Sequence, residues 1–150
     1  MNNSKEEPLP KPTIIAKNLF DKLVQEITNF GDRVHHLLPK CSEKDLQRLL
    51  EGYLLATFPD EVVSHEFPFR HSCIDVTFGK RPSIPIEVKL SREDEKIRDK
   101  IGQGSEQASE FLRASGSRKG ILVVGDKKRD PETNREYNGK WRNHVYIIVV

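Results

Sequence analysis

The spacing of apolar residues predicts a first amphipathic helix near the start of the chain. Apolar side chains recur every three or four positions from Ile15 to Phe30, and Gly31 is expected to end this helix. Residues 1–12 carry three prolines and no such period. That composition predicts a disordered tail ahead of the folded part.

A second helix is expected to begin at Ser42. Ser42 and Asp45 have the spacing of a capping box, and Pro59 is expected to follow the end of the helix. The predicted buried stripe of this helix consists of Leu46, Leu49, Leu50, Tyr53 and Leu54.

Alternating and continuous apolar runs predict five strands after these helices. A third helix is expected between the third and fourth strands, at residues 97–114, with Gly116 as its stop. A polar loop of about twenty residues separates the last two strands, and Asn138–Gly139 in it predicts a hairpin turn. The order α-α-β-β-β-α-β-β predicts an α/β fold, a mixed β-sheet flanked by helices. The strands are expected at residues 62–67, 73–78, 84–90, 119–125 and 144–150.

Composition favours one soluble domain, which we expect over residues 13–150. Charged residues make up 32% of the 150 positions, and no apolar run is long enough to cross a membrane. The two cysteines, Cys41 and Cys73, give neither a disulfide framework nor a zinc-site spacing, which favours an intracellular, cytoplasmic setting. The chain stops within an apolar segment, as a domain cut from a longer protein would.

Charged residues interrupt the second and third predicted strands. The five-residue connection 79–83 predicts an antiparallel hairpin in which Phe78 pairs with Ile84. In that register Asp75 lies opposite Glu87 on the same face of the sheet, with β-carbons roughly 5 Å apart.

Such a pair of carboxylates repels itself unless something positive lies between its members. A divalent cation removes the repulsion, because magnesium prefers carboxylate oxygens. Lys89 projects from the same face two residues further along, where an ammonium can hold a metal-bound water or stabilise charge on a phosphate. This combination suits the hydrolysis of phosphodiester bonds.

These residues resemble the motif of the PD-(D/E)XK nuclease superfamily. Asp75 in "IDV" matches the first acid, and Glu87 and Lys89 in "IEVK" match the Glu-x-Lys element, although Ile74 stands where the motif has proline. The resemblance implies a restriction-endonuclease-like fold, an Mg²⁺ or Mn²⁺ cofactor, and nucleic acid as substrate, DNA more than RNA. It also implies that the metal is bound by both acids and by the main-chain carbonyl of Val88.

The resemblance extends to the neighbouring helices. Nucleases of this type often carry a further acid on the helix before the sheet, and both Glu43 and Glu51 are candidates, with Glu43 favoured. Gln107 and Phe111 resemble the Gln-x-x-x-Tyr element of RecB-type nucleases, with Phe in the tyrosine position. The resemblance gives Gln107 the role of orienting groups around the carboxylates.

Basic residues are unevenly distributed along the chain. Residues 76–150 hold 16 Lys and Arg against 11 Asp and Glu, whereas residues 1–75 hold 9 against 12. A basic second half is compatible with a polyanionic partner. The candidates for contacting nucleic acid are Lys80, Arg81, Lys127, Lys128, Arg129 and Trp141.

Several alternatives remain open at this stage. The charged strand residues fit a solvated sheet face, Glu43 fits a favourable charge in a first helical turn, and residues 125–143 fit a solvated loop. A catalytically inactive nucleic-acid-binding module of the same fold is the alternative function. Because nucleases of this type often dimerise to cut two strands, a homodimer is an expected assembly.

Overall fold

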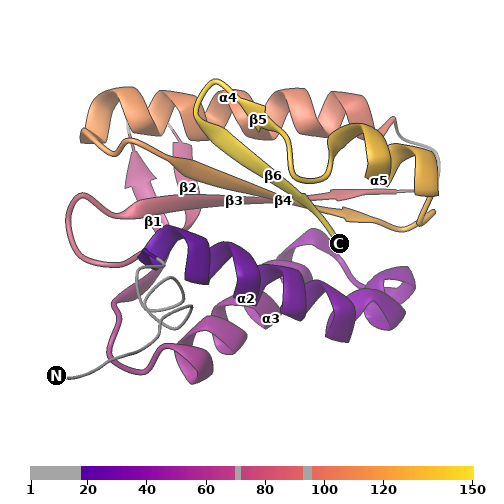
Figure 1. The fold of residues 1–150 in the computed structure, drawn as a ribbon, viewed down its shortest axis with the longest axis horizontal. Coiled ribbons are helices and arrows are strands. Elements are labelled where there is room, and N and C mark those ends of the chain that lie inside the picture. The colour runs from indigo at the N-terminus through magenta and orange to yellow at the C-terminus, as the bar shows by residue number, and fades with distance from the viewer. Residues whose placement is uncertain (1–17, 70–71, 93–95) are drawn as a thin grey trace, which may run out of the picture.

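The computed structural model describes residues 18–69, 72–92 and 96–150, so the predicted tail at residues 1–12 lies outside the described residues. Within these ranges the chain forms a sheet with helices on both faces (Figure 1). The elements are α2 (Leu19–Val34), a 3₁₀ helix η1 (His35–Lys40), α3 (Glu43–Thr57), β1 (Val63–Phe69), β2 (Ser72–Phe78), β3 (Ile84–Ser91), α4 (Ile97–Ser115), β4 (Gly120–Asp126), α5 (Pro131–Tyr137), β5 (Trp141–Arg142) and β6 (Val145–Val149).

The sheet is mixed and has the strand order β1-β2-β3-β4-β6-β5. Strands β3, β4 and β6 are parallel, whereas β1, β2 and β5 pair antiparallel to their neighbours. Helices α2 and α3 cover one face, and α4 covers the other (Figure 1). The predicted α/β class, a mixed sheet flanked by helices, is confirmed. In the described part of the chain, no helix combines the length and apolar character that crossing a membrane requires.

Side-chain alternation along the strands divides the core in two. On β3, Ile86, Val88 and Leu90 pack with the helices α2 and α3. On β4, Leu122 and Val124 point to the other face and pack with α4. The alternate residues of β2 and β3, which include the charged ones, therefore face α4.

The predicted start and end of α3 and the predicted end of α4 are confirmed. Ser42 and Asp45 form the capping box, each side chain bonding the other residue's N–H at 3.0 Å. Helix α3 stops at Thr57, ahead of Pro59. Helix α4 ends at Gly116, whose φ of 78° lies in the left-handed region that glycine adopts at low cost.

Two predictions about the first helices are wrong. Gly31 lies inside α2 rather than at its end, and a β-carbon there would come within 2.7 Å of Val150 Cγ1. The absence of a β-carbon at Gly31 lets α2 pack closely against Val150, and the helix does not end there. On α3, Leu49 is 39% exposed and Gln47 is only 5% exposed. The side of the helix that faces the sheet carries the fully buried Leu46, Leu50 and Leu54, and Gln47 on that side donates a hydrogen bond to the carbonyl of Asp75.

The predicted loop before the last strand contains the helix α5 and the short strand β5. Asp130 caps α5, and Pro131 occupies its first turn, where no hydrogen-bond donor is needed. Asn138–Gly139 does not form the hairpin turn. Instead Asn143 and His144, with φ values of 52° and 68°, connect β5 to β6, as a tight hairpin with two positive φ angles requires.

Candidate active site

The predicted register of β2 and β3 is confirmed, but the pairing is short. Phe78 pairs with Ile84 and Val76 with Ile86, and the pairing of these two strands ends there. Beyond this point β2 continues along β1, and β3 continues along β4. The two strands therefore separate just where Asp75 and Glu87 lie.

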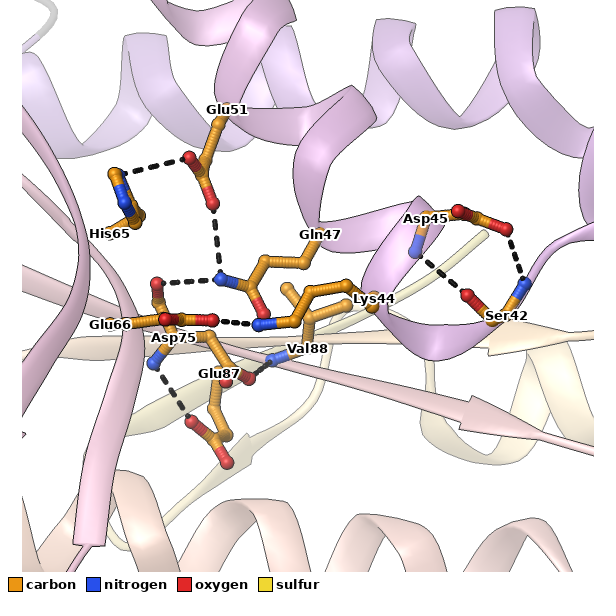
Figure 2. Close-up of polar contacts among 10 residues, drawn as sticks. All are labelled: Ser42, Lys44, Asp45, Gln47, Glu51, His65, Glu66, Asp75, Glu87 and Val88. Atoms are coloured by element: carbon orange, nitrogen blue, oxygen red, sulfur yellow. Dashed lines mark hydrogen bonds and ion pairs between the residues drawn. The ribbon is translucent and has the colours of Figure 1, made fainter.

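Carboxylates take the place of backbone partners at this strand separation. Asp75 Oδ2 accepts a hydrogen bond of 2.8 Å from the N–H of Val88 (Figure 2). Glu87 Oε1 accepts one of 3.3 Å from the N–H of Asp75. Asp75 is partly buried and Glu87 is only 1% exposed. The two predicted metal ligands are thus brought together, each tied to the opposite strand.

Helix α3 supplies two more groups to the separation. Glu43 Oε1 accepts a hydrogen bond of 2.9 Å from the N–H of Leu90, and Gln47 Nε2 donates one of 3.1 Å to the carbonyl of Asp75. Alternate N–H groups of a strand point to the same side, so those of Val88 and Leu90 both face the separation. Asp75 and Glu43 consequently lie side by side along the free edge of β3.

Glu51 occupies a different position from Glu43. Its Oε2 accepts a hydrogen bond of 3.0 Å from Gln47, and its Oε1 lies 3.5 Å from His65 Nδ1 (Figure 2). Glu51 is linked to Asp75 through Gln47, whereas Glu43 bonds β3 itself.

A further acid on β1 borders the site. Glu66 lies between His65 and Phe67, whose partners are Val76 and Ile74, which places Glu66 opposite Asp75. Its φ of 49° is unusual for a residue other than glycine, and such outliers concentrate at functional sites. Lys44 of α3 forms an ion pair with Glu66, which balances the charge of this acid (Figure 2).

Removal from water shifts both carboxyl groups towards the protonated form. Burial raises the pKa of Glu87 to about 8, and the negative charge of Asp75 adds to the shift, against the attraction of Lys89. Burial also raises the pKa of Asp75, while the hydrogen bond from Val88 opposes that rise. Burial, more than repulsion between the two groups, therefore makes the ionised forms of these carboxyl groups costly.

Lys89 lies beside the pair, as the sequence predicts. Its Nζ is 3.6 Å from Glu87 Oε2, and the side chain is 14% exposed. Gly104 of α4 lies over the stem of Lys89, where a β-carbon would come within 3.1 Å of Lys89 Cγ. The close approach of α4 holds the ammonium near the carboxylates.

Gln107 is on the part of α4 that passes over the site. Gly104 of α4 lies over Lys89, near the end of β3. One turn later on α4, Ala108 lies close to Gly120 of β4, next to Pro85 at the start of β3. Helix α4 thus runs antiparallel to β3, and Gln107 falls between these contacts. Gln107 Oε1 is buried and has no hydrogen-bond partner within the described ranges.

The predicted nucleic-acid contacts do not form one surface. Lys80 and Arg81 are exposed in the turn between β2 and β3, on the hairpin that carries the carboxylates. Lys127, Lys128 and Arg129 directly follow β4. Trp141 is on the edge strand β5 and stacks on Phe20 with ring centroids 5.6 Å apart, so it lies apart from those three cations.

Gln47, like Glu66, is a residue at the site that sequence reasoning missed. It is spaced four residues from Glu43 and from Glu51, so the three side chains share one side of α3. That spacing was the available signal, because a glutamine between two candidate acids shares their environment.

The oxygen atoms at the strand separation fit a hard divalent cation. In the described residues, no group of three or more His, Cys, Asp or Glu side chains is arranged to hold a metal ion. Magnesium does not require such a group, since it keeps several waters and is commonly bound through one or two carboxylates. Asp75 and Glu87 supply two, and the Val88 carbonyl points to the same side as its N–H, towards Asp75.

Comparisons of the chain with known proteins found no relative. No protein-family model matches it, and neither does any curated protein or solved structure. The geometry at the strand separation is therefore the basis for a functional proposal.

Proposed function

We propose that this chain is a metal-dependent nuclease that hydrolyses phosphodiester bonds of nucleic acid, DNA in preference to RNA. The fold would be restriction-endonuclease-like, of the PD-(D/E)XK type. One observation carries the proposal: two carboxylates meet at a strand separation with a lysine ammonium 3.6 Å from one of them.

Burial of these acids is costly for a fold that does not use them. Carboxylates are seldom buried unless they are paired or bind metal, and the raised pKa of Glu87 reflects that cost. Perturbed groups of this kind cluster at functional sites. A site for Mg²⁺ or Mn²⁺ explains why the sequence keeps both acids.

Asp75 and Glu87 would hold the cation, with the main-chain carbonyl of Val88 as a further oxygen. Glu43 is the better candidate for an additional acid than Glu51, because it lies beside Asp75 along the free edge of β3. Gln47 would fix the backbone of Asp75, and Glu51 would fix Gln47.

A bound divalent cation would supply the acidity that turns water into a nucleophile at neutral pH. Lys89 would hold the attacking water or stabilise the negative charge that develops on the phosphate. Gln107 has a buried oxygen to which no described residue donates a hydrogen bond, and this oxygen can accept one from that water or from the substrate. Lys80 and Arg81, on the same hairpin, would contact the backbone phosphates.

The first test is cleavage of plasmid DNA, single-stranded DNA and RNA of matched length, each with Mg²⁺, with Mn²⁺ and with EDTA. We expect DNA cleavage that requires the cation and that falls by about 10²–10³-fold in Lys89→Ala, the loss typical of removing a group that stabilises transition-state charge. Lys22→Ala, at an exposed position on α2, is the matched control and should cleave as the wild type does.

Calorimetric titration with Mn²⁺ tests the cation site separately from cleavage. Uptake is expected in the wild type and in Lys89→Ala, and its loss is expected in Asp75→Asn and Glu87→Gln. Salt-sensitive binding of DNA without any cleavage or uptake would favour the inactive binding module instead.

A further inference from the structure

A pocket of about 540 Å³ lies between the β2–β3 turn and the second half of α4, and neither Asp75 nor Glu87 is among the described residues that line it. Thr77 forms part of its floor and lies on the same face of β2 as Asp75, two residues or roughly 7 Å along the strand. Phe111, one helical turn after Gln107, lines the wall from α4. The pocket therefore continues the proposed active site along the face that α4 covers.

The walls combine apolar surface with positive charge. The exposed side chains of Val62 and Pro82 contribute apolar surface, and Lys80 and Arg81 contribute charge, whereas Phe111 is only 3% exposed. No acidic residue is among the described residues that line it. An anionic ligand with a flat, apolar part matches this lining.

The far end of the pocket has a fixed shape. Ser117 Oγ donates a hydrogen bond of 2.5 Å to the carbonyl of Ser83, and Ser115 Oγ bonds Ser117 Oγ at 3.0 Å. These bonds tie the end of α4 to the β2–β3 turn. A rigid wall of this kind favours a pocket that is already formed before its ligand arrives.

We propose that this pocket binds one unpaired nucleotide of the substrate strand, beside the phosphate that is cut. The base would lie against Val62 and Pro82, and Lys80 and Arg81 would hold its phosphate. The volume suits one nucleoside, whereas a base in a duplex would bring its partner strand into the same space. Enzymes that act on nucleic acid commonly take single bases into such pockets.

This inference rests on the proposed function, and it deepens it by naming the substrate class. The enzyme would act where a strand is single or splayed, such as an overhang, a flap or a junction. A chain that binds only intact duplex would have no use for this pocket.

Binding measured in EDTA separates this inference from catalysis. Fluorescence anisotropy compares a blunt duplex with the same duplex carrying a 3′ or a 5′ overhang, for the wild type and for Ala114→Trp. Ala114 is exposed on α4 and lines the pocket, so tryptophan there fills the pocket without removing a core contact. Ala56→Trp, at an exposed position of α3 on the other face of the sheet, is the matched control.

We expect one overhang to bind at least tenfold more tightly than the blunt duplex. Replacing the overhang nucleotides one at a time by abasic units should lower affinity at one position. Ala114→Trp should remove the preference for the overhang and the sensitivity to the abasic position, and should keep the affinity for blunt duplex. Ala56→Trp should keep the preference and the sensitivity. Equal binding of overhang and duplex by the wild type, or an unchanged preference in Ala114→Trp, would overturn the inference. A preference without cleavage in Mg²⁺ would overturn the proposed function alone.

Discussion

Strand β4 and the hairpin β2–β3 belong to one sheet, yet their buried side chains differ in kind. All seven residues of β4 are buried and the four from Ile121 to Val124 are apolar, while the buried Asp126 at its end accepts hydrogen bonds from the N–H groups of Lys128 and Asp130. Strand β4 pairs with β3 on one side and with β6 on the other. Strands β2 and β3 stop pairing at Val76–Ile86 and bury Glu87 at 1% exposure.

The difference shows which part of the sheet stabilises the fold and which part is arranged for chemistry. Burial of apolar side chains along β4 contributes about 25 cal/mol for each Å² removed from water. Burial of Glu87 next to Asp75 opposes folding whenever both are ionised, which the raised pKa of each carboxyl group reflects. Protonation or a bound cation would relieve that opposition.

The pH dependence of stability should show this contrast most strongly. Without metal, the folded chain keeps a proton on Glu87 up to its pKa of about 8, whereas the unfolded chain releases it near the ordinary value of 4.5. The free energy of unfolding is therefore expected to fall as the pH rises from about 4.5 to about 8, by about 1.4 kcal/mol for each unit of pKa difference. Chemical denaturation in EDTA at a series of pH values measures this fall.

Glu87→Gln should remove most of this slope, leaving the smaller contribution of Asp75, and should raise the stability at pH 8. Glu110→Gln, at an exposed position of α4, should keep the wild-type slope. If the slopes of wild type and Glu87→Gln coincide, the buried carboxyl group is not the source of the pH dependence.

Leu122→Ala should have the opposite effect on stability, and at every pH. Leu122 is fully buried on β4 and packs with α4, so its truncation leaves a cavity. The free energy of unfolding is expected to fall by about 2–5 kcal/mol. Leu55→Ala is the control, because Leu55 is 53% exposed on α3 and its loss should change stability by less than about 0.5 kcal/mol. A loss in Leu122→Ala as small as in Leu55→Ala would contradict this role of β4.

A divalent cation should stabilise the separated hairpin through binding. Binding to the folded chain alone contributes about 2.7 kcal/mol at a hundredfold excess over Kd. The effect on Tm should be larger at pH 8 than at pH 5.5, since protons on Glu87 and Asp75 compete with the cation. Asp75→Asn should abolish it and Glu110→Gln should not. An equal shift of Tm in Asp75→Asn would place the cation elsewhere.

Much of the hairpin could be predicted from the sequence because its determinants are local. The length of the turn at residues 79–83 sets the register, and alternation sets the faces, so the positions of Asp75, Glu87 and Lys89 followed. The strand separation could not be predicted. At the separation Glu43 accepts a hydrogen bond from Leu90 and Gln47 donates one to Asp75, and these partners lie 47 and 28 residues apart in the chain.

The errors have equally specific causes. Asn138–Gly139 is a strong turn signal, but α5 ends at Tyr137 and leaves this pair at its C-terminus. The signal for α5 was present in Asp130 and Pro131, which form a cap and a first turn. Leu49 fits the apolar period of α3, yet the buried side is the one with Leu46, Leu50 and Leu54, where Gln47 also bonds the sheet.

Two glycines of α4 test the comparison of β4 with the β2–β3 hairpin at the scale of single atoms. Gly104 contacts both β4 and the hairpin, and Gly102 contacts neither. A β-carbon at Gly104 would overlap the Leu122 side chain and come within 3.1 Å of Lys89 Cγ, whereas one at Gly102 meets nothing within 4 Å. Gly102→Ala should therefore stabilise the fold by about 0.5–1 kcal/mol, the usual gain of alanine over glycine in a helix. Gly104→Ala should destabilise it by about 1–3 kcal/mol through overpacking and should also lower cleavage by displacing Lys89. Urea denaturation and cleavage rates of both variants check these effects, and equal behaviour of the two would show that α4 does not hold Lys89 in place.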